Sequence, residues 1–245
     1  MSSVLITGGS SGIGAALVRR AAGAGWQVAF TYKTHPGEAQ KLVQELSSHA
    51  VRALPLDLNV PETITACVGG LAKDGGTLDA IVLSAAPGPS VNPLWKETDA
   101  SFLEQFSANV IGNRNLLAAC WKTFFRNQSK GHVVALLSLA MGPPPSAQMA
   151  SYIIGKRALQ TLLECALVEY GPSGLRASAV IPTFTETPML GNFHTHFLEM
   201  ARQKSPSGSF LSAEHVAEQI FRCLEEPPTT TELALRAVSF PTTIS

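Results

Sequence analysis

Residues Val4–Trp26 read VLITGGSSGIGAALVRRAAGAGW, an apolar run followed by a glycine-dense turn and an alanine-rich segment. This order predicts a buried strand, a tight turn and a helix. Gly8, Gly12 and Gly14 fall in the turn, where glycine permits a sharp bend and lets an anion approach main-chain N–H groups. The start of the helix offers further N–H groups to the same anion. The stretch therefore predicts a phosphate-binding strand–turn–helix unit, although such a turn alone is also compatible with a role in packing.

The rest of the chain repeats this alternation of short apolar runs and longer helical patterns. The predicted strands are Ser3–Gly8, Gln27–Tyr32, Val51–Asp57, Asp79–Ala85, His132–Ser138 and Leu175–Ile181. The predicted helices lie near Ile13–Ala24, Gly37–Ser48, Pro61–Lys73, Asp99–Asn127 and Gln148–Tyr170, with another after Ser212. Residues 232–238 (ELALRAV) are compatible with a last strand. The pattern predicts an α/β fold with a single Rossmann-like, doubly wound parallel sheet flanked by helices.

Composition and length indicate a folded protein of one domain over residues 1–245, with 45% hydrophobic and 15% charged residues. The formal net charge of zero gives no indication of nucleic acid or an anionic membrane as a partner. The four cysteines are scattered and form no CxxC pair, which is typical of free thiols in a reducing compartment. No signal peptide or membrane span is visible, so the sequence predicts a cytoplasmic protein.

One segment, at about residues 185–210, interrupts the alternation and is predicted to be an excursion that covers a site. Phe184, Met189, Phe193 and Phe197 make it apolar, which favours a substrate with hydrophobic character. His194 and His196 form a His-x-His pair without a third ligand nearby, so no metal site is predicted.

The glycine spacing, Thr7-Gly8-x-x-x-Gly12-Ile13-Gly14, resembles the short-chain dehydrogenase/reductase family, and four downstream motifs extend the likeness from Ser3 to about Met189. SYIIGKRAL supplies the family's catalytic Tyr152 and Lys156. ALLSLAMG supplies Ser138, FSANVIGNRN supplies Asn109, and IPTFTETPM supplies Pro182 and Thr187. Each residue alone is more often structural, whereas the whole set in the right order favours the catalytic interpretation. The resemblance implies a 3-oxoacyl-reductase-like member.

The chemistry of these residues suits hydride transfer to a carbonyl. The resulting alkoxide needs a proton, which the Tyr152 hydroxyl can give. A nearby Lys156 ammonium is expected to lower the tyrosine pKa from its ordinary value near 10. Ser138 is expected to hydrogen-bond the substrate oxygen. By the resemblance, Asn109 holds a water that passes protons to Lys156.

The end of the second predicted strand favours NADP(H) over NAD(H). An acidic residue there selects the ribose hydroxyl of NAD. The chain has Tyr32 and Lys33 instead, and Lys33 with Ser10 or Thr34 is suited to hold a 2′-phosphate. The alternative is that Lys33 is an ordinary solvated surface lysine. The cofactor-contacting set implied by the resemblance is Gly8, Ser10, Ser11, Gly12, Ile13, Gly14, Tyr32, Lys33, Asp57, Leu58, Ser84, Ala85, Ala86, Tyr152, Lys156, Pro182, Thr185 and Thr187.

Three features depart from the family pattern, and one of them is the spacing between Ser138 and Tyr152, which is one residue longer than the commonest spacing. Ser84-Ala85-Ala86-Pro87 stands where the family usually has Asn-Asn-Ala-Gly, and Thr183 replaces the glycine after Pro182. Pro87 lacks an N–H and fixes φ, so this loop cannot copy the usual backbone fully.

The leading function is therefore an NADP(H)-dependent oxidoreductase that acts on a carbonyl or secondary alcohol of a small or acyl-type substrate. Alternatives are a cofactor-binding regulator with weak or no catalysis, which the altered loop favours, and a nucleotide-sugar epimerase or dehydratase, for which the chain is short. A homodimer or homotetramer is expected, because related enzymes pair through two long helices. Here Leu159, Leu162, Leu163, Ala166 and Leu167 give the second of them a largely apolar surface.

Overall fold

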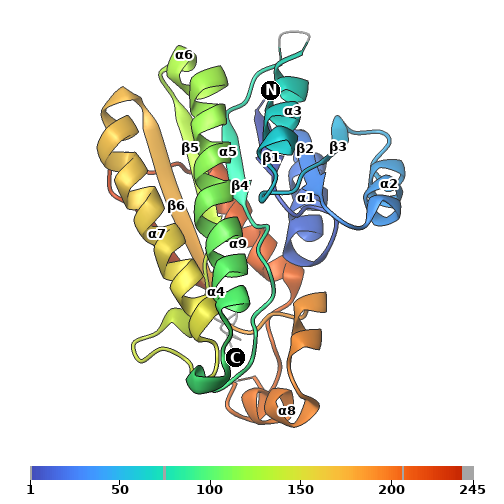
Figure 1. Cartoon of the computed structure of the whole chain (residues 1–245). Helices are drawn as coiled ribbons and strands as arrows, with labels where there is room; N and C mark the ends of the chain where they lie inside the picture. Colours follow the sequence, from blue (N-terminus) through green and yellow to red (C-terminus); the bar gives the residue numbers. More distant parts are fainter. Residues whose placement is uncertain (1, 74–75, 206, 239–245) are drawn as a thin grey trace.

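Seven parallel strands form one sheet in the computed structural model, which describes residues 2–73, 76–205 and 207–238 (Figure 1). The strand order is β3-β2-β1-β4-β5-β6-β7, and all six neighbouring pairs are parallel. The strands are β1 Ser3–Ile6, β2 Gln27–Tyr32, β3 Val51–Pro55, β4 Ala80–Leu83, β5 Gly131–Leu136, β6 Leu175–Pro182 and β7 Ala234–Val238. The predicted doubly wound parallel sheet is confirmed, including the strand within residues 232–238.

Helices cover both faces of the sheet because its strands are apolar on both sides. In β1, Leu5 belongs to the core on one face, whereas Val4 and Ile6 belong to the core on the other. The first face is covered by α3 Pro61–Ala72, α5 Asn113–Cys120 and α7 Ala150–Tyr170. The second is covered by α1 Gly12–Gly23, α2 Pro36–Glu45 and α9 Ala213–Glu225. The sheet is thus buried between two layers, as parallel sheets require.

The helix predicted over Asp99–Asn127 is a continuous helical path with two π-helical turns. It runs through α4 Asp99–Phe106, η3 Ser107–Gly112, α5, η4 Trp121–Phe125 and α6 Arg126–Gln128, where η3 and η4 are the π-helical turns. Thr98 caps its start, because its Oγ1 accepts a hydrogen bond from the Ser101 N–H at 3.2 Å. A Cβ at Gly112 would lie 2.4 Å from the Leu58 carbonyl oxygen, so glycine permits close contact with the loop after β3.

The segment after β6 forms two short helices, η7 Pro188–Asn192 and α8 Thr195–Gln203, within the predicted excursion. Two backbone hydrogen bonds join the two ends of this segment. The Glu186 N–H donates to the Leu211 carbonyl at 2.8 Å, and the Leu211 N–H donates to the Phe184 carbonyl at 3.0 Å. Phe184 packs against the rings of Phe193, Phe197 and Phe210. Figure 1 shows α8 at the end of the molecule where α4 and α7 begin.

The strand order reverses between β1 and β4, since β2 and β3 lie on one side of β1 and β4 to β7 lie on the other. In open α/β sheets, the carboxyl ends of strands at such a point border a crevice that binds ligands. None of the helices within the described ranges is both long and apolar enough to cross a membrane.

Candidate active site

A cavity of about 710 Å³ lies at the carboxyl ends of β1 to β6. Its lining contains every predicted site residue except Asn109. These lining residues are Gly8, Ser10, Ser11, Gly12, Ile13, Gly14, Tyr32, Lys33, Asp57, Leu58, Ser84, Ala85, Ala86, Ser138, Tyr152, Lys156, Pro182, Thr185 and Thr187. Segments that are far apart in the sequence therefore converge on one site.

The glycine turn is shaped to leave the cavity open beside main-chain N–H groups. Gly8 and Gly12 have φ values of +66° and +52°, which side chains disfavour. A Cβ at Gly14 would lie 2.2 Å from the Gly8 carbonyl oxygen, so only glycine allows this close turn. The first turn of α1 carries no acidic residue, and the Ser11 side chain makes no capping hydrogen bond. This arrangement fits the diphosphate of a dinucleotide.

Thr7 fastens the loop after β4 to the glycine turn. Its Oγ1 accepts hydrogen bonds from the N–H groups of Ser84 and Ala85, both at 3.0 Å, and donates to the Val82 carbonyl at 3.1 Å. Gly8 lies directly against Ala85, because a Cβ at Gly8 would be 3.0 Å from the Ala85 Cα. The first half of this loop is thus firmly held despite its unusual sequence.

At the end of β2, Lys33 is engaged by a carboxylate. Its Nζ lies 2.9 Å from Oδ2 of Asp57, which the sequence places after β3. Burial would raise the pKa of Asp57, but a hydrogen bond from the Asn59 N–H and the Lys33 ammonium outweigh it and hold the pKa below its ordinary value. Both residues line the cavity, together with Thr34 and His35. The sequence did not predict this ion pair.

Tyr152, Ser138 and Lys156 come together where β5 ends and α7 begins. Tyr152 and Ser138 both line the cavity, and the Ser138 Oγ accepts a hydrogen bond from the Ala140 N–H at 3.2 Å. The Lys156 Nζ lies 5.8 Å from the Tyr152 ring centroid and donates to the Leu136 carbonyl at 2.8 Å. Residues 152 and 156 are one helical turn apart, so both side chains leave α7 on the same side.

The pKa of Tyr152 is raised, which differs from the expected lowering. Burial disfavours the phenolate, and the Ser138 side chain offsets this effect only in part. Burial also lowers the pKa of Lys156 to about 8. The ammonium is therefore not the dominant influence on the tyrosine in this structure. A tyrosine with a raised pKa keeps its proton at neutral pH, as a proton donor must.

Asn109 lies behind the cavity and not in its lining. It is fully buried in the π-helical turn η3, and its Nδ2 donates to both the backbone and side-chain oxygens of Gln105, each at 3.0 Å. Its Oδ1 is buried and has no hydrogen-bond partner among the described residues. Sequence reasoning missed Gln105, whose only signal is a polar residue one turn before Asn109 on an otherwise buried helix face.

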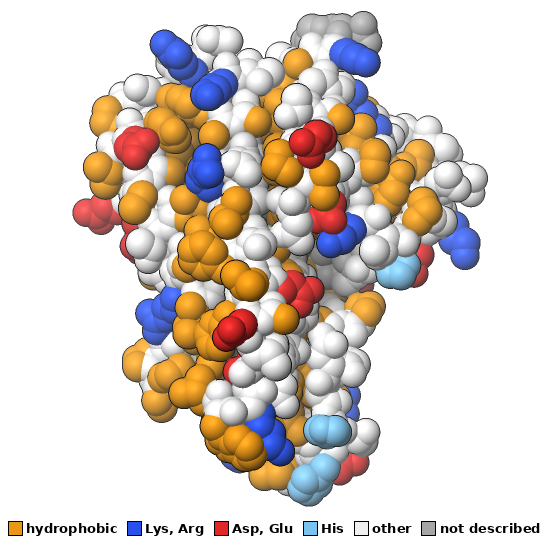
Figure 2. All heavy atoms as spheres, in the orientation of Figure 1, with side chains coloured by type: hydrophobic (Ala, Val, Ile, Leu, Met, Phe, Trp, Pro, Cys, Tyr) orange, Lys and Arg blue, Asp and Glu red, His pale blue; other side chains and the backbone are white. Residues whose placement is uncertain are grey.

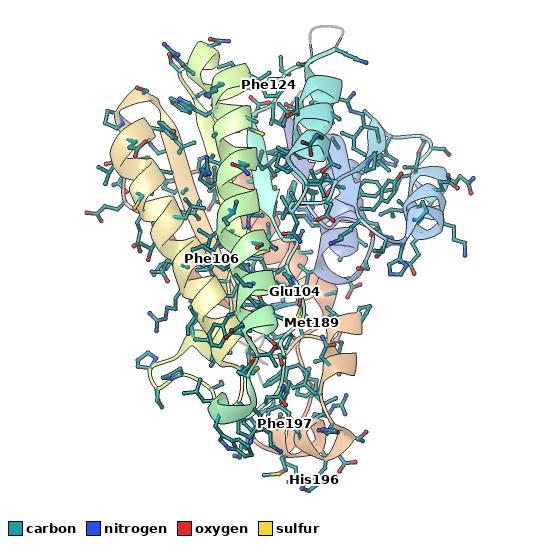
Figure 3. All side chains as sticks on the ribbon, viewed as in Figure 1. Glu104, Phe106, Phe124, Met189, His196 and Phe197 are labelled. Carbon is teal, nitrogen blue, oxygen red and sulfur yellow. The ribbon has the colours of Figure 1, made fainter. Side chains whose placement is uncertain are left out.

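The excursion and the residue before it contribute apolar side chains to the wall of the cavity. Phe184, Met189 and Phe193 line it, and Phe197 stacks against Phe193 without lining it. Figure 3 labels Met189 and Glu104, which both line the cavity, and His196, which lies in the first turn of α8 and does not line it. Over the residues that the structure describes, no group of three or more His, Cys, Asp or Glu side chains is arranged to hold a metal ion.

Comparisons of the chain with family models, curated proteins and solved structures point to the same family. A family model described as short chain dehydrogenase matches residues 2–196. The chain is 25% identical over 218 residues to cis-4-hydroxycyclohexanecarboxylate dehydrogenase of Sinomonas cyclohexanicum, covering 88% of this chain and 86% of that protein. It is 31% identical over 180 residues to the cyclic-di-GMP-binding biofilm dispersal mediator protein of Escherichia coli K12, covering 73% and 71%. A variant of actinorhodin polyketide ketoreductase, solved with NADPH, superposes with a TM-score of 0.86 at 20% identity, covering 97% of this chain and 95% of that chain.

Proposed function

This chain belongs to the short-chain dehydrogenase/reductase family, and on that premise we propose that it is an NADP(H)-dependent reductase of an apolar carbonyl compound. The observation that carries the proposal is the meeting of Ser138, Tyr152 and Lys156 in the cavity that also contains the glycine turn. When bound, NADP(H) supplies or accepts the hydride. The glycine turn would hold its diphosphate, and Lys33 would face its adenosine ribose.

The protein's own residues would manage the substrate oxygen and its proton. The Ser138 hydroxyl is suited to hold that oxygen beside Tyr152. Because burial keeps Tyr152 protonated, its hydroxyl can donate to the oxygen as negative charge develops there. Lys156, whose pKa is lowered to about 8, is placed to return a proton toward the tyrosine. Phe184, Met189 and Phe193 would exclude water and favour an apolar substrate.

The test is a panel of cyclic, aryl and short acyl ketones, followed by the loss of NADPH absorbance. Reduction of one class with a clear preference would support the proposal. The alternative is a cofactor-binding regulator of the same fold, which the similarity to the cyclic-di-GMP-binding protein favours. A regulator would bind the cofactor, or cyclic-di-GMP in its place, and turn over no member of the panel.

Cofactor choice is expected to depend on Lys33. Lys33→Ala should weaken NADPH binding about tenfold and leave NADH binding nearly unchanged, because the ammonium is useful only where a 2′-phosphate is present. Removing it would also leave the Asp57 carboxylate, now 2.9 Å from Lys33, to repel that phosphate. Fluorescence titration with both cofactors measures the effect.

Lys41→Ala provides the control, because it removes the same charge from an exposed position of α2 that does not line the cavity. Equal weakening of NADPH and NADH by Lys33→Ala would contradict the NADP(H) assignment. Lys33 would then be a surface lysine whose role is its ion pair with Asp57.

We also propose that the protein forms at least a homodimer through the face of α4 and α7. The residues first considered for this role do not support it, because Leu159, Leu163, Ala166 and Leu167 are buried in the core and Leu162 packs against it. Other residues of these two helices, and one residue of the adjoining turn η3, are exposed and apolar. They are Leu103, Phe106, Ile111, Ile154 and Val168.

Figure 2 shows hydrophobic side chains gathered over this face, and Figure 3 labels Phe106 on α4. Light scattering at micromolar concentration should give the mass of a dimer or tetramer. Phe106→Lys should shift that mass toward the monomer, because it places a charge in an apolar contact. A monomeric wild type would contradict the proposal.

A further inference from the structure

The Gln105 side chain links the loop after β4 to Asn109. It lies on α4 and is 2% exposed, which is unusual for a glutamine. Its Nε2 donates to the Gly88 carbonyl at 2.8 Å and, more weakly, to the Pro87 carbonyl at 3.4 Å. Its Oε1 accepts from the Asn109 Nδ2 at 3.0 Å. All the polar atoms of this side chain are therefore used.

The two ends of this link are functional in the proposed reaction. Pro87 and Gly88 continue the loop whose earlier residues, Ser84 to Ala86, line the cavity. Thr7 holds the first half of that loop, and Gln105 holds the second half. Because Pro87 has no N–H, the backbone of this residue can accept hydrogen bonds but cannot donate one. A side-chain amide donor supplies what carbonyl groups need.

The helix that carries Tyr152 and Lys156 presses on the same residue. A Cβ at Gly155 would lie 3.2 Å from the Gln105 Cβ and 3.2 Å from the Asn109 Nδ2. Gly155 thus brings α7 into contact with the Gln105–Asn109 pair one residue before Lys156. A substitution at Gln105 would therefore alter the packing or hydrogen bonding of the loop, of Asn109 and of α7.

We propose that Gln105 is a positioning residue, which fastens the cofactor-facing loop at Pro87–Gly88 to Asn109 and so keeps the cavity in its binding shape. This role rests on the proposed function, because it is defined by cofactor binding. The hydrogen bond from Nε2 to the Gly88 carbonyl sets cofactor affinity. The hydrogen bond that Oε1 accepts from Asn109 orients the Asn109 side chain.

Two substitutions separate this role from simple packing. Gln105→Met keeps the length of the side chain and removes both polar functions. Gln105→Glu keeps an acceptor for Asn109, but an ionised carboxylate faces the Gly88 carbonyl without a proton to donate. Protonation of the introduced carboxylate restores a hydrogen-bond donor toward the Gly88 carbonyl. Because burial raises the pKa of a carboxyl group, this protonation falls in a pH range in which binding can be measured.

The experiment measures NADP⁺ affinity by calorimetry between about pH 5 and 8, with NAD⁺ in parallel. Gln105→Met should bind about three- to tenfold more weakly than wild type at every pH, as expected for the loss of such hydrogen bonds. Gln105→Glu should bind at least as weakly near pH 8 and recover toward wild type near pH 5. A variant that had only lost packing would show no such recovery.

Gln128→Met is the matched control, because the Gln128 Nε2 donates to the Leu78 carbonyl at 3.4 Å at the other end of the same helical path. It should bind NADP⁺ like wild type. Equal affinity of Gln105→Met and wild type would overturn the positioning role, as would a Gln105→Glu defect that is constant with pH. If wild type bound neither NADP⁺ nor NAD⁺, the proposed function itself would be wrong, and the role of Gln105 would fail with it.

Discussion

Tyr152→Phe should lower kcat for carbonyl reduction by about a hundred- to ten-thousandfold and leave NADPH affinity within about threefold of wild type. The substitution removes one hydroxyl from a buried ring and leaves the ring, which packs with Met149 and Ile153, in place. The lost group is the proton donor for the developing alkoxide. Since burial raises the pKa of Tyr152, its proton is present at neutral pH. Stopped-flow and steady-state assays of NADPH consumption measure the effect.

Tyr170→Phe is the control for this prediction. Tyr170 ends the same helix, stacks on Trp121 with ring centroids 4.5 Å apart, and does not line the cavity. Removing its hydroxyl should leave kcat unchanged. Wild-type turnover in Tyr152→Phe would remove Tyr152 from the reaction. Loss of NADPH binding in the same variant would mean that the hydroxyl holds the cofactor instead.

Local patterns predicted the sheet, and every predicted site residue except Asn109 lines the cavity, because both depend on short stretches of sequence. In β1, alternate residues enter the two cores, and Gly8, Gly12 and Gly14 mark a turn that tolerates no side chain at position 14. Parallel strands then bring their carboxyl ends to one edge of the sheet. Residues after different strands, such as Ser84 and Ser138, therefore line the same cavity.

What could not be predicted depends on contacts between distant segments. The Lys33–Asp57 ion pair joins residues after two different strands, and the Gln105–Gly88 hydrogen bond joins a helix to a loop. The pKa of Tyr152 depends on how deeply α7 packs, because burial raises it. Likewise, which face of α7 packs against the sheet depends on tertiary contacts, and that face carries Leu159 and Leu163, which lie in the core.

The second large effect concerns stability in acid, and it arises from His132 in β5. This histidine is 5% exposed, and its Nε2 is 3.1 Å from the Ser178 Oγ. Its Nδ1 is buried with no hydrogen-bond partner among the described residues. Burial lowers the pKa of His132 to about 4 from an ordinary value of 6.5. The His132 imidazole is therefore buried in its neutral form in the folded protein.

The sign of the pH dependence follows from proton binding. Between about pH 6.5 and 4 the unfolded chain protonates His132 and the folded chain does not, so the free energy of unfolding falls as the pH is lowered. A depression of this size corresponds to about 3 kcal/mol, lost over that window. Carboxylates with lowered pKa values, such as Asp79, also lose stability in acid, but both the wild type and a His132 variant retain them. The difference between the two proteins isolates the histidine.

His132→Gln should therefore flatten the pH dependence of stability. Glutamine keeps an amide to bond Ser178 and cannot be protonated, so the variant should lose about 2–3 kcal/mol less than wild type between pH 7 and about pH 4.5. Urea unfolding at the two pH values measures this difference. His49→Gln, which removes an exposed imidazole before β3, should leave the wild-type dependence intact. Parallel curves for His132→Gln and wild type would show that His132 is protonated in the folded protein, and that the sheet at β5 and β6 accommodates its charge.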